Sequence, residues 1–232
     1  MKFLLTALLL LILLSAVKSG TESGPAEETA FGEIIIRGAD SVPRGVLLSG
    51  SGIRQSGDKL LVDPDALDRV ISQSPLVRSH TISVSEGKLY IHLEENPLLF
   101  TAVLKTARGN LFLEADENLK IRVKGYPVSA NLPIIYIEES DYEDGGFSGR
   151  VREIAGILKR IKRDEPELYT EISELHMESG FVVVMVKGRR TEFLVNSSYG
   201  SFMRFKYILG YVDRSNDIFS KADIRGNPVL LR

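Results

Sequence analysis

The side chains best suited to acid–base chemistry near neutral pH are three histidines, His80, His92 and His176. The local pattern predicts a strand around each of them, and none lies in a Gly-x-Ser-x-Gly, His-Glu-x-x-His or similar frame. A hydrolase needs a nucleophile with an adjacent base, or two carboxylates in a cleft. We therefore expect no catalytic residue and no enzyme. His80 and His92 have no acid or histidine at a ligating spacing, which favours two surface residues over metal ligands.

Two glycine-containing loops are the other places where a ligand would bind. Residues 138–146 are acidic, but no twelve-residue frame there has glycine sixth and glutamate twelfth, as a calcium loop requires. Residues 49–57 have no P-loop lysine, and Gln55 stands where a third glycine would be needed. The absence of cysteine excludes thiolate metal sites. We expect a solvated loop and a plain turn, with no metal, no cofactor and no small-molecule substrate.

The overall charge is nearly balanced, with 29 Lys and Arg against 31 Asp and Glu. Such a balance gives no long-range attraction for nucleic acid, so we expect no nucleic-acid partner. Without the N-terminal run and a linker, roughly 200 residues remain, which is enough for one large or two small domains.

An apolar run near the N-terminus determines where the chain is expected to work. Residues 3–17 are almost entirely apolar and lie between Lys2 and Lys18. As a helix they would span roughly 22 Å, less than the ~30 Å hydrocarbon core of a bilayer. The run fits either a short membrane-spanning anchor, residues 1–20, or a cleaved secretory signal. Both interpretations export the rest of the chain, and the acids in and around the linker at 21–30 place the N-terminus inside.

Residues 31–96 are predicted to form a small unit of strands and helices. The expected elements are a strand at 33–38, a short helix at 42–48, a helix that follows Asp63, and a hairpin of strands at 77–85 and 88–94. Asp63 can cap its helix, and Pro64 suits the first helical position. One three-stranded sheet covered by two helices would bury the apolar stripes of both helices.

Residues 97–232 are predicted to form a larger, antiparallel-rich mixed β domain with two helices on its sheet, which makes the fold class α+β. The expected strands are at 98–104, 109–115, 119–123, 131–137, 171–177, 181–187 and 191–195. The expected helices, at 150–163 and 201–212, each have one apolar stripe. The valines at 182–184 suggest a central strand covered on both faces. The helix at 150–163 is better explained as cover for the sheet than as a basic helix on lipid headgroups.

A strand close to the C-terminal end is expected to leave backbone N–H and C=O groups unpaired on its outer side. Such an edge can accept a partner strand, with main-chain bonds giving affinity and alternate side chains giving selection. About half of the apolar residues Ile224, Leu230 and Leu231 would instead belong to the core. Asp223 and Arg225 would equally suit a local ion pair.

The chain also resembles a known family. In the first unit the resemblance to a POTRA domain is carried by Ile36-x-Gly38, Leu60-Leu-Val62 and the run from Pro75 to Pro97. The end of the chain is similar to that of the β domain in the FtsQ/DivIB family of bacterial cell-division proteins, in the residues Asp223-Ile-Arg225, Gly226-Asn-Pro228 and Val229-Leu-Leu231. Leu132-Pro133 and the two helices fall in the family's order.

The resemblance implies a single-pass protein of the bacterial inner membrane, with its N-terminus inside and the bulk of the chain extracytoplasmic. It implies a divisome scaffold that recruits FtsB and FtsL-like division proteins through the last strand of the β domain. We expect the partner-binding residues to be Asp223, Ile224, Arg225, Val229, Leu230 and Leu231, assisted by Arg204 and Lys206. The alternative is a POTRA-containing protein-transport or outer-membrane assembly factor, a class that normally carries a long C-terminal barrel.

Overall fold

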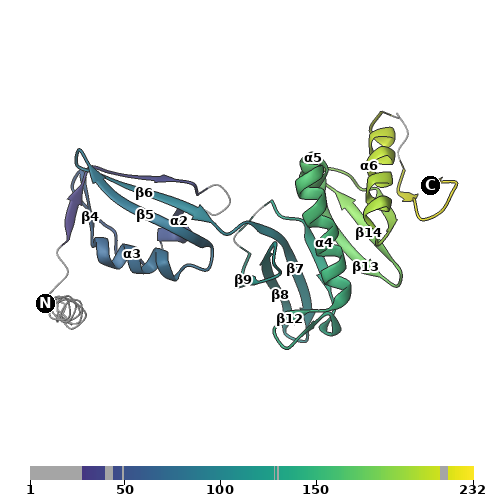
Figure 1. The fold of residues 1–232 in the computed structure, drawn as a ribbon, viewed down its shortest axis with the longest axis horizontal. Coiled ribbons are helices and arrows are strands. Elements are labelled where there is room, and N and C mark those ends of the chain that lie inside the picture. The colour runs from purple at the N-terminus through teal and green to yellow at the C-terminus, as the bar shows by residue number, and fades with distance from the viewer. Residues whose placement is uncertain (1–27, 40–43, 49, 128, 130, 215–218) are drawn as a thin grey trace, which may run out of the picture.

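The computed structural model describes residues 28–39, 44–48, 50–127, 129, 131–214 and 219–232 (Figure 1). Within these ranges, no helix is long and apolar enough to cross a membrane. The predicted anchor, residues 1–20, and most of the predicted linker lie outside the described residues. The described elements gather around two separate apolar cores, which lie side by side where β6 leads into β7 (Figure 1).

The first core lies between a three-stranded sheet and two helices. The strands are β2 (Glu33–Arg37), β6 (Lys88–Glu95) and β5 (Val77–Ser85), in that order, with β2 parallel and β5 antiparallel to β6. The helices are α2 (Arg44–Leu48) and α3 (Pro64–Gln73). Asp63 caps α3 as predicted, because its Oδ1 accepts the N–H groups of Asp65 and Ala66 at 3.0 Å each.

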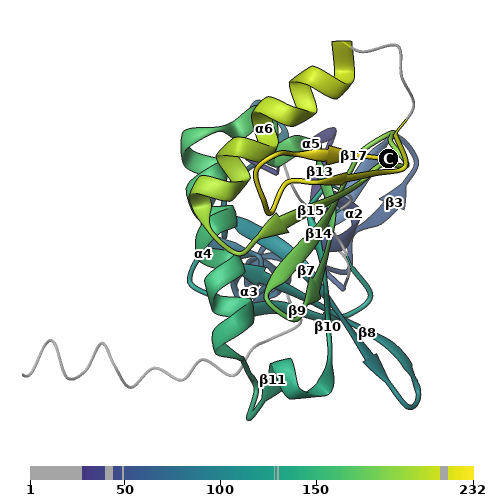
Figure 2. The same cartoon turned by 90° about the vertical axis from the view of Figure 1, so that its right-hand side faces the viewer.

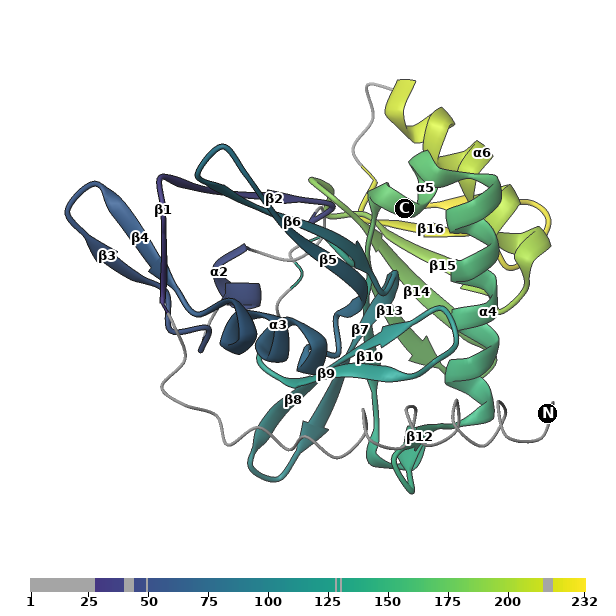
Figure 3. The same ribbon diagram turned by 60° about the vertical axis from the view of Figure 1, so that its left-hand side comes forward.

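A second small sheet in this unit was not predicted from the sequence. It consists of β1 (Thr29–Phe31), β4 (Lys59–Val62) and β3 (Arg54–Ser56), in the order β1-β4-β3 (Figure 3). The plain turn expected at 49–57 therefore contains a strand. Strands of three or four residues are too short to show a clear alternation, and pairing with neighbouring segments forms them.

The second core lies against one nine-stranded sheet, in the order β17-β16-β15-β14-β13-β10-β7-β8-β9. Its strands are β7 (Leu98–Thr106), β8 (Gly109–Asp116), β9 (Ile121–Gly125), β10 (Ile134–Ile137), β13 (Ile172–Glu178), β14 (Phe181–Val186), β15 (Glu192–Asn196), β16 (Lys221–Asp223) and β17 (Leu230–Leu231). β10 runs parallel to β7 and β13, and β15 runs parallel to β16, whereas the other pairs are antiparallel. The mixed, antiparallel-rich sheet predicted from the sequence is confirmed.

Three helices cover one face of this sheet: α4 (Gly149–Asp164), α5 (Pro166–Glu171) and α6 (Tyr199–Arg214) (Figure 2). The predicted stripe of α4 is buried, with Val151, Leu158 and Ile161 fully inside. Near its C-terminus, Lys162 Nζ donates to Glu117 Oε1 at 3.0 Å and to the carbonyl of Leu98 at 3.2 Å. The expectation that α4 covers the sheet is confirmed.

The prediction that the valine-rich strand is covered on both faces is wrong. In β14, Val182 and Val184 are buried against the helices, whereas Phe181, Val183 and Met185 are only half-buried on the other side. The helices α4, α5 and α6 pack on the same face of the sheet, and no described helix covers the opposite face (Figure 2). Three adjacent valines do not reveal on which side the helices will pack.

The acidic loop is also more ordered than predicted. It folds into η1 (Glu139–Asp141), β11 (Tyr142–Glu143) and β12 (Gly146–Phe147) around Asp141, whose residue surface is only 4% exposed. The carboxylate accepts Glu138 N–H, Ser148 Oγ–H and an Arg150 N–H at 3.0–3.1 Å. Burial alone would raise the pKa of Asp141, but these hydrogen bonds together lower it. This segment is a structured turn, not a solvated loop.

His80 is likewise not a surface residue, in contrast to the prediction. Its side chain is 13% exposed, and Nε2 lies 2.8 Å from Oδ1 of Asp68 on α3. The partner carboxylate comes from the helix that packs over the strand, so the spacing along the strand does not reveal it. His92 is exposed, as expected.

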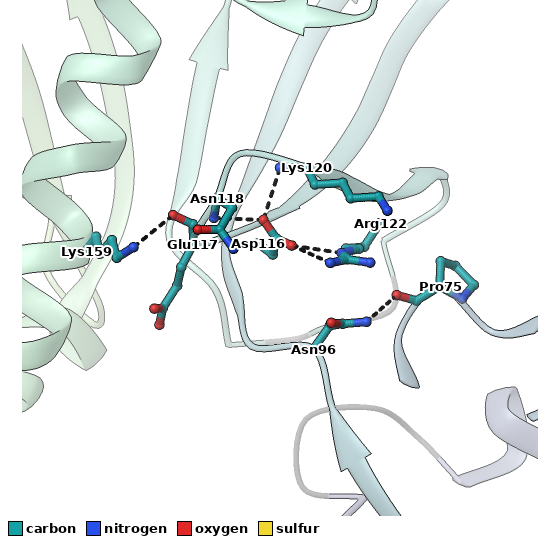
Figure 4. Close-up of polar contacts among 8 residues, drawn as sticks. All are labelled: Pro75, Asn96, Asp116, Glu117, Asn118, Lys120, Arg122 and Lys159. Carbon is teal, nitrogen blue, oxygen red and sulfur yellow. Dashed lines mark hydrogen bonds and ion pairs between the residues drawn. The ribbon is translucent and has the colours of Figure 1, made fainter. Parts of the chain in front are cut away.

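The two cores meet at the residues that lead from β6 into β7. The side-chain amide of Asn96 donates to the carbonyl of Pro75 at 2.9 Å (Figure 4). The backbone N–H of Asn96 donates to the carbonyl of Leu76. Leu98 belongs to the first core, whereas Leu99 belongs to the second. The residues that connect β6 to β7 therefore pack against both cores, and they place the nine-stranded sheet next to the smaller unit.

Candidate partner-binding edge

β17 is the outer strand at one end of the nine-stranded sheet. It pairs antiparallel with β16, with Leu231 opposite Ala222 and Leu230 opposite Asp223. The N–H of Arg232 donates to the carbonyl of Lys221 at 2.9 Å, and the N–H of Lys221 donates to the carbonyl of Arg232 at 3.1 Å. Arg232 and Lys221 therefore form a hydrogen-bonded pair of the ladder.

The main-chain groups of Leu231 point away from β16. In an antiparallel ladder, residues alternate between hydrogen-bonded and non-hydrogen-bonded pairs, and members of the second kind direct N–H and C=O outward. Because Arg232 is of the first kind, Leu231 is of the second. Its N–H and C=O face the outer side of the sheet, in the position from which a further strand could be bonded.

The apolar residues expected at this edge have two different environments. Ile224 is 2% exposed and belongs to the second core, and Val229 and Leu231 pack partly against the same core. Leu230 points to the other side and is 46% exposed. Of these four residues, only Leu230 therefore has a large exposed apolar side chain. Ile224, Val229 and Leu231 pack against the second core and anchor the edge strands to it.

Asp223 and Arg225 form the local ion pair that the sequence allowed. Arg225 Nε and Nη2 donate to the two carboxylate oxygens of Asp223 at 2.9 and 2.7 Å. The hydrogen bonds from Arg225 are the main cause that lowers the pKa of Asp223 to about 2. The Arg225 guanidinium also lies over the ring of Phe181, 4.3 Å from its centroid.

The pair contributes to one wall of a hollow beside β17. Its volume is about 270 Å³, and it is lined by Leu194, Lys221, Asp223, Arg225, Leu230 and Arg232. Sequence reasoning did not find Phe181, Leu194 and Lys221 as part of this surface. Leu194 joins this surface because β15 pairs with β16, and Phe181 lies one strand further, on β14, which pairs with β15.

The two helical residues predicted to assist lie on α6, which packs on the helix-covered face. Lys206 Nζ lies 2.5 Å from Glu165 Oε2, and this pairing raises the pKa of Lys206. Arg204 is half-buried. Because Asp223 and Leu230 face the opposite side of the sheet, the structure does not bring Lys206 together with them.

The third histidine lies in the middle of the open face. The ring of His176 stacks on Tyr136, with centroids 4.3 Å apart, and its Nε2 is 3.0 Å from Glu174 Oε2. Burial, and then Glu174, raise the pKa of Tyr136. Within the described ranges, no group of three or more histidine and acidic side chains is arranged to hold a metal ion.

Comparisons with known proteins give little further guidance. No family model matches the chain, and no curated protein matches it. Among solved structures, the chain is similar to the major extracytoplasmic domain of the trans isomer of the bacterial cell division protein DivIB from Geobacillus stearothermophilus. The sequence identity is 15% and the TM-score is 0.35, over 52% of this chain and 98% of that chain. Values this low do not establish a shared function.

Proposed function

We propose that this protein is a non-catalytic scaffold of bacterial cell division, of the FtsQ/DivIB type, anchored by residues 1–20 in the inner membrane. Its extracytoplasmic part recruits FtsB/FtsL-like division proteins, and the contact is the addition of a partner strand to β17. The family resemblance of residues 223–231 supports the choice of partner class. No cofactor or small-molecule substrate takes part.

The observation that carries the proposal is the position of β17 at the end of the sheet, with the main-chain groups of Leu231 directed outward. A partner strand in this position would bond to these groups and extend the sheet by one strand. Leu230 is the exposed apolar side chain next to them, and Arg225 is held beside it by Asp223. Backbone bonds would supply affinity, and these side chains would select the partner.

Two variants test this contact in the full chain. Deletion of residues 226–232 removes β17 but keeps Ile224 in the core. Leu230→Arg keeps the strand and changes only the exposed side chain. We expect both variants to capture much less of the FtsB-type protein encoded by the same genome in a pull-down. Tyr126→Arg is the matched control, because Tyr126 is 90% exposed and follows β9 at the other end of the sheet. Full capture by the deletion variant would refute the proposal.

A depletion experiment separates the proposal from the alternative, a transport or outer-membrane assembly factor. Cells that lose a division scaffold continue to grow without septation, so we expect filaments after depletion. Cells that lose an assembly factor should instead lose barrel proteins from the outer membrane. Loss of barrel proteins without filamentation would favour the alternative.

A further inference from the structure

The chain that joins the smaller unit, built on the first core, to the larger unit, built on the second, has little conformational freedom. Only Asn96 and Pro97 separate β6 from β7. The ring of Pro97 fixes its φ angle, and a residue before a proline is restricted to extended conformations. The side-chain amide and the backbone N–H of Asn96 are both bonded to the smaller unit, at the carbonyls of Pro75 and Leu76 (Figure 4). The connection therefore cannot bend freely without breaking these bonds.

Leu98, the first residue of β7, takes part in both units. Its side chain is buried in the first core. Its main chain belongs to the nine-stranded sheet, where Leu98 lies opposite Asp116 and its carbonyl accepts Lys162 Nζ of α4 at 3.2 Å. The next carbonyl, of Leu99, accepts the buried hydroxyl of Tyr169 at 2.6 Å. A change in the angle between the units would therefore either withdraw the Leu98 side chain from the first core or break main-chain contacts in the larger unit.

Two more side chains of the larger unit pack against the first core. They are Val123 on β9 and Leu132, shortly before β10, and both are partly buried. The turn that leads into β9 is held by the buried carboxylate of Asp116. This carboxylate accepts two backbone N–H groups of the turn, at 2.8 and 3.0 Å, and the Arg122 guanidinium at 2.7 Å (Figure 4). The ordered turn thus fixes the position from which Val123 reaches the first core.

The angle at this junction determines where the edge strand β17 lies. The N-terminal strand β1 and the C-terminal end of the chain lie at opposite ends of the long axis of the molecule (Figure 1). β9 and β17 are the two ends of the nine-stranded sheet, separated by eight strand spacings, or roughly 38 Å at ~4.8 Å per spacing. A rotation of about 15° between the units would displace β17 by roughly 10 Å. Relative motion of this kind is the usual expectation for two domains unless packing opposes it.

We infer that the junction locks the two units into one orientation, so that β17 is held at a fixed distance and direction from the smaller unit. The lock has two parts: the restricted and bonded backbone at 96–97, and the insertion of Leu98, Val123 and Leu132 into the first core. The inference concerns how the edge is presented, and not what binds to it. In a chain anchored by residues 1–20, as proposed above, the lock would also set the distance of β17 from the bilayer.

Double electron–electron resonance tests the lock in the full chain, kept soluble with detergent. Because the chain has no cysteine, two spin labels can be placed at Val84→Cys, on the smaller unit, and at Tyr207→Cys, on α6, which are both exposed. A pair within the larger unit, Tyr126→Cys with Tyr207→Cys, gives the reference width. We expect one narrow Val84–Tyr207 distance distribution, about as wide as the reference.

The first part of the lock is tested by Asn96→Gly combined with Pro97→Gly. This change removes the side-chain bond and the proline restriction, and the Val84–Tyr207 distribution should become about twice as wide. Ala107→Gly combined with Arg108→Gly is the matched control, because it introduces two glycines in the exposed turn between β7 and β8. The control should leave the width unchanged.

The second part is tested by Val123→Ala combined with Leu132→Ala, which shortens two side chains at the first core. Val229→Ala combined with Leu111→Ala is the matched control, because it removes the same atoms from partly buried positions that pack against the second core. We expect the first pair to widen the distribution about twofold and the control pair to leave it unchanged. Circular dichroism verifies that each variant is folded.

The outcomes separate this inference from the proposed function. A broad distribution in the chain with an unmodified junction, or an unchanged width in both junction variants, would overturn the inference even if β17 captures its partner. Equal widening by Val229→Ala with Leu111→Ala would also overturn it, because loosening would then not depend on the junction. A narrow distribution that widens only in the junction variants would support the lock even if β17 captured no partner.

Discussion

The backbone of Leu231 provides a sharp test of strand addition, because a single atom can be changed. Replacing Leu231 by its α-hydroxy acid converts the outward N–H into an ester oxygen and keeps the side chain. The bonds between β17 and β16 at Arg232 and Lys221 remain. The same replacement at Leu230 is the matched control, because Leu230 lies in a hydrogen-bonded pair with Asp223 and its N–H faces inward.

The expected magnitudes differ in binding and in folding. At Leu231, a partner carbonyl loses its donor in a buried position, which costs about 1–3 kcal/mol and corresponds to a roughly 5- to 150-fold weaker complex. The free energy of unfolding should change by less than ~0.5 kcal/mol, because no internal bond is lost. At Leu230, the lost ladder bond should lower the stability by about 1 kcal/mol.

The absence of cysteine makes the variants accessible, because a single introduced cysteine, for example Ser220→Cys, gives a unique ligation site for the C-terminal segment. Binding is measured by fluorescence anisotropy of a labelled FtsB-type partner, and stability by urea unfolding. An ester at Leu231 that binds as tightly as the amide would refute the reasoning, provided that the urea midpoint is unchanged.

Three further predictions concern side chains. Ile224→Ala should destabilise the fold by about 2–5 kcal/mol in urea unfolding, because Ile224 is 2% exposed. Leu230→Ala should leave the stability nearly unchanged and weaken partner capture. Equal losses of stability would contradict the assignment of Ile224 to the core and of Leu230 to the surface. Asp141→Asn should lower the free energy of unfolding by about 1–3 kcal/mol, because it weakens the bonds to Arg150 and its neighbours. The pKa of Asp141 is lowered in the folded state, so the stabilisation by its carboxylate is present above about pH 4 and is lost as the pH falls further. Because the pKa of Asp223 is lowered to about 2, the Arg225 pair should persist from pH 8 to about pH 3 and open only as the pH falls toward about 2, which a titration followed by NMR of the Arg225 side chain would detect.

Local rules predicted the individual elements well. The cap at Asp63 and the proline after it define the start of α3 because all the interacting groups lie within three residues. The stripe on α4 and the alternation in β5 and β6 are likewise readable, since one side of each element faces a core.

Features that depend on tertiary packing could not be predicted in the same way. The side of the sheet on which α4 and α6 pack decides that Val183 faces solvent while Val184 is buried, and neighbouring valines do not encode this. The contacts of His80 with Asp68 and of His176 with Tyr136 join segments that are distant in sequence. The sequence predicted an edge within residues 223–231, but Phe181 and Leu194 join it only through strand pairing.

Hydrogen exchange at the backbone amide of Leu231 tests the central claim most directly. Addition of a partner strand to β17 bonds this amide, so its exchange should slow at least tenfold when the FtsB-type protein is present, while the exposed backbone of the β11–β12 turn, around Asp144, is unaffected. An unchanged exchange rate at Leu231 in a saturated complex would contradict the account.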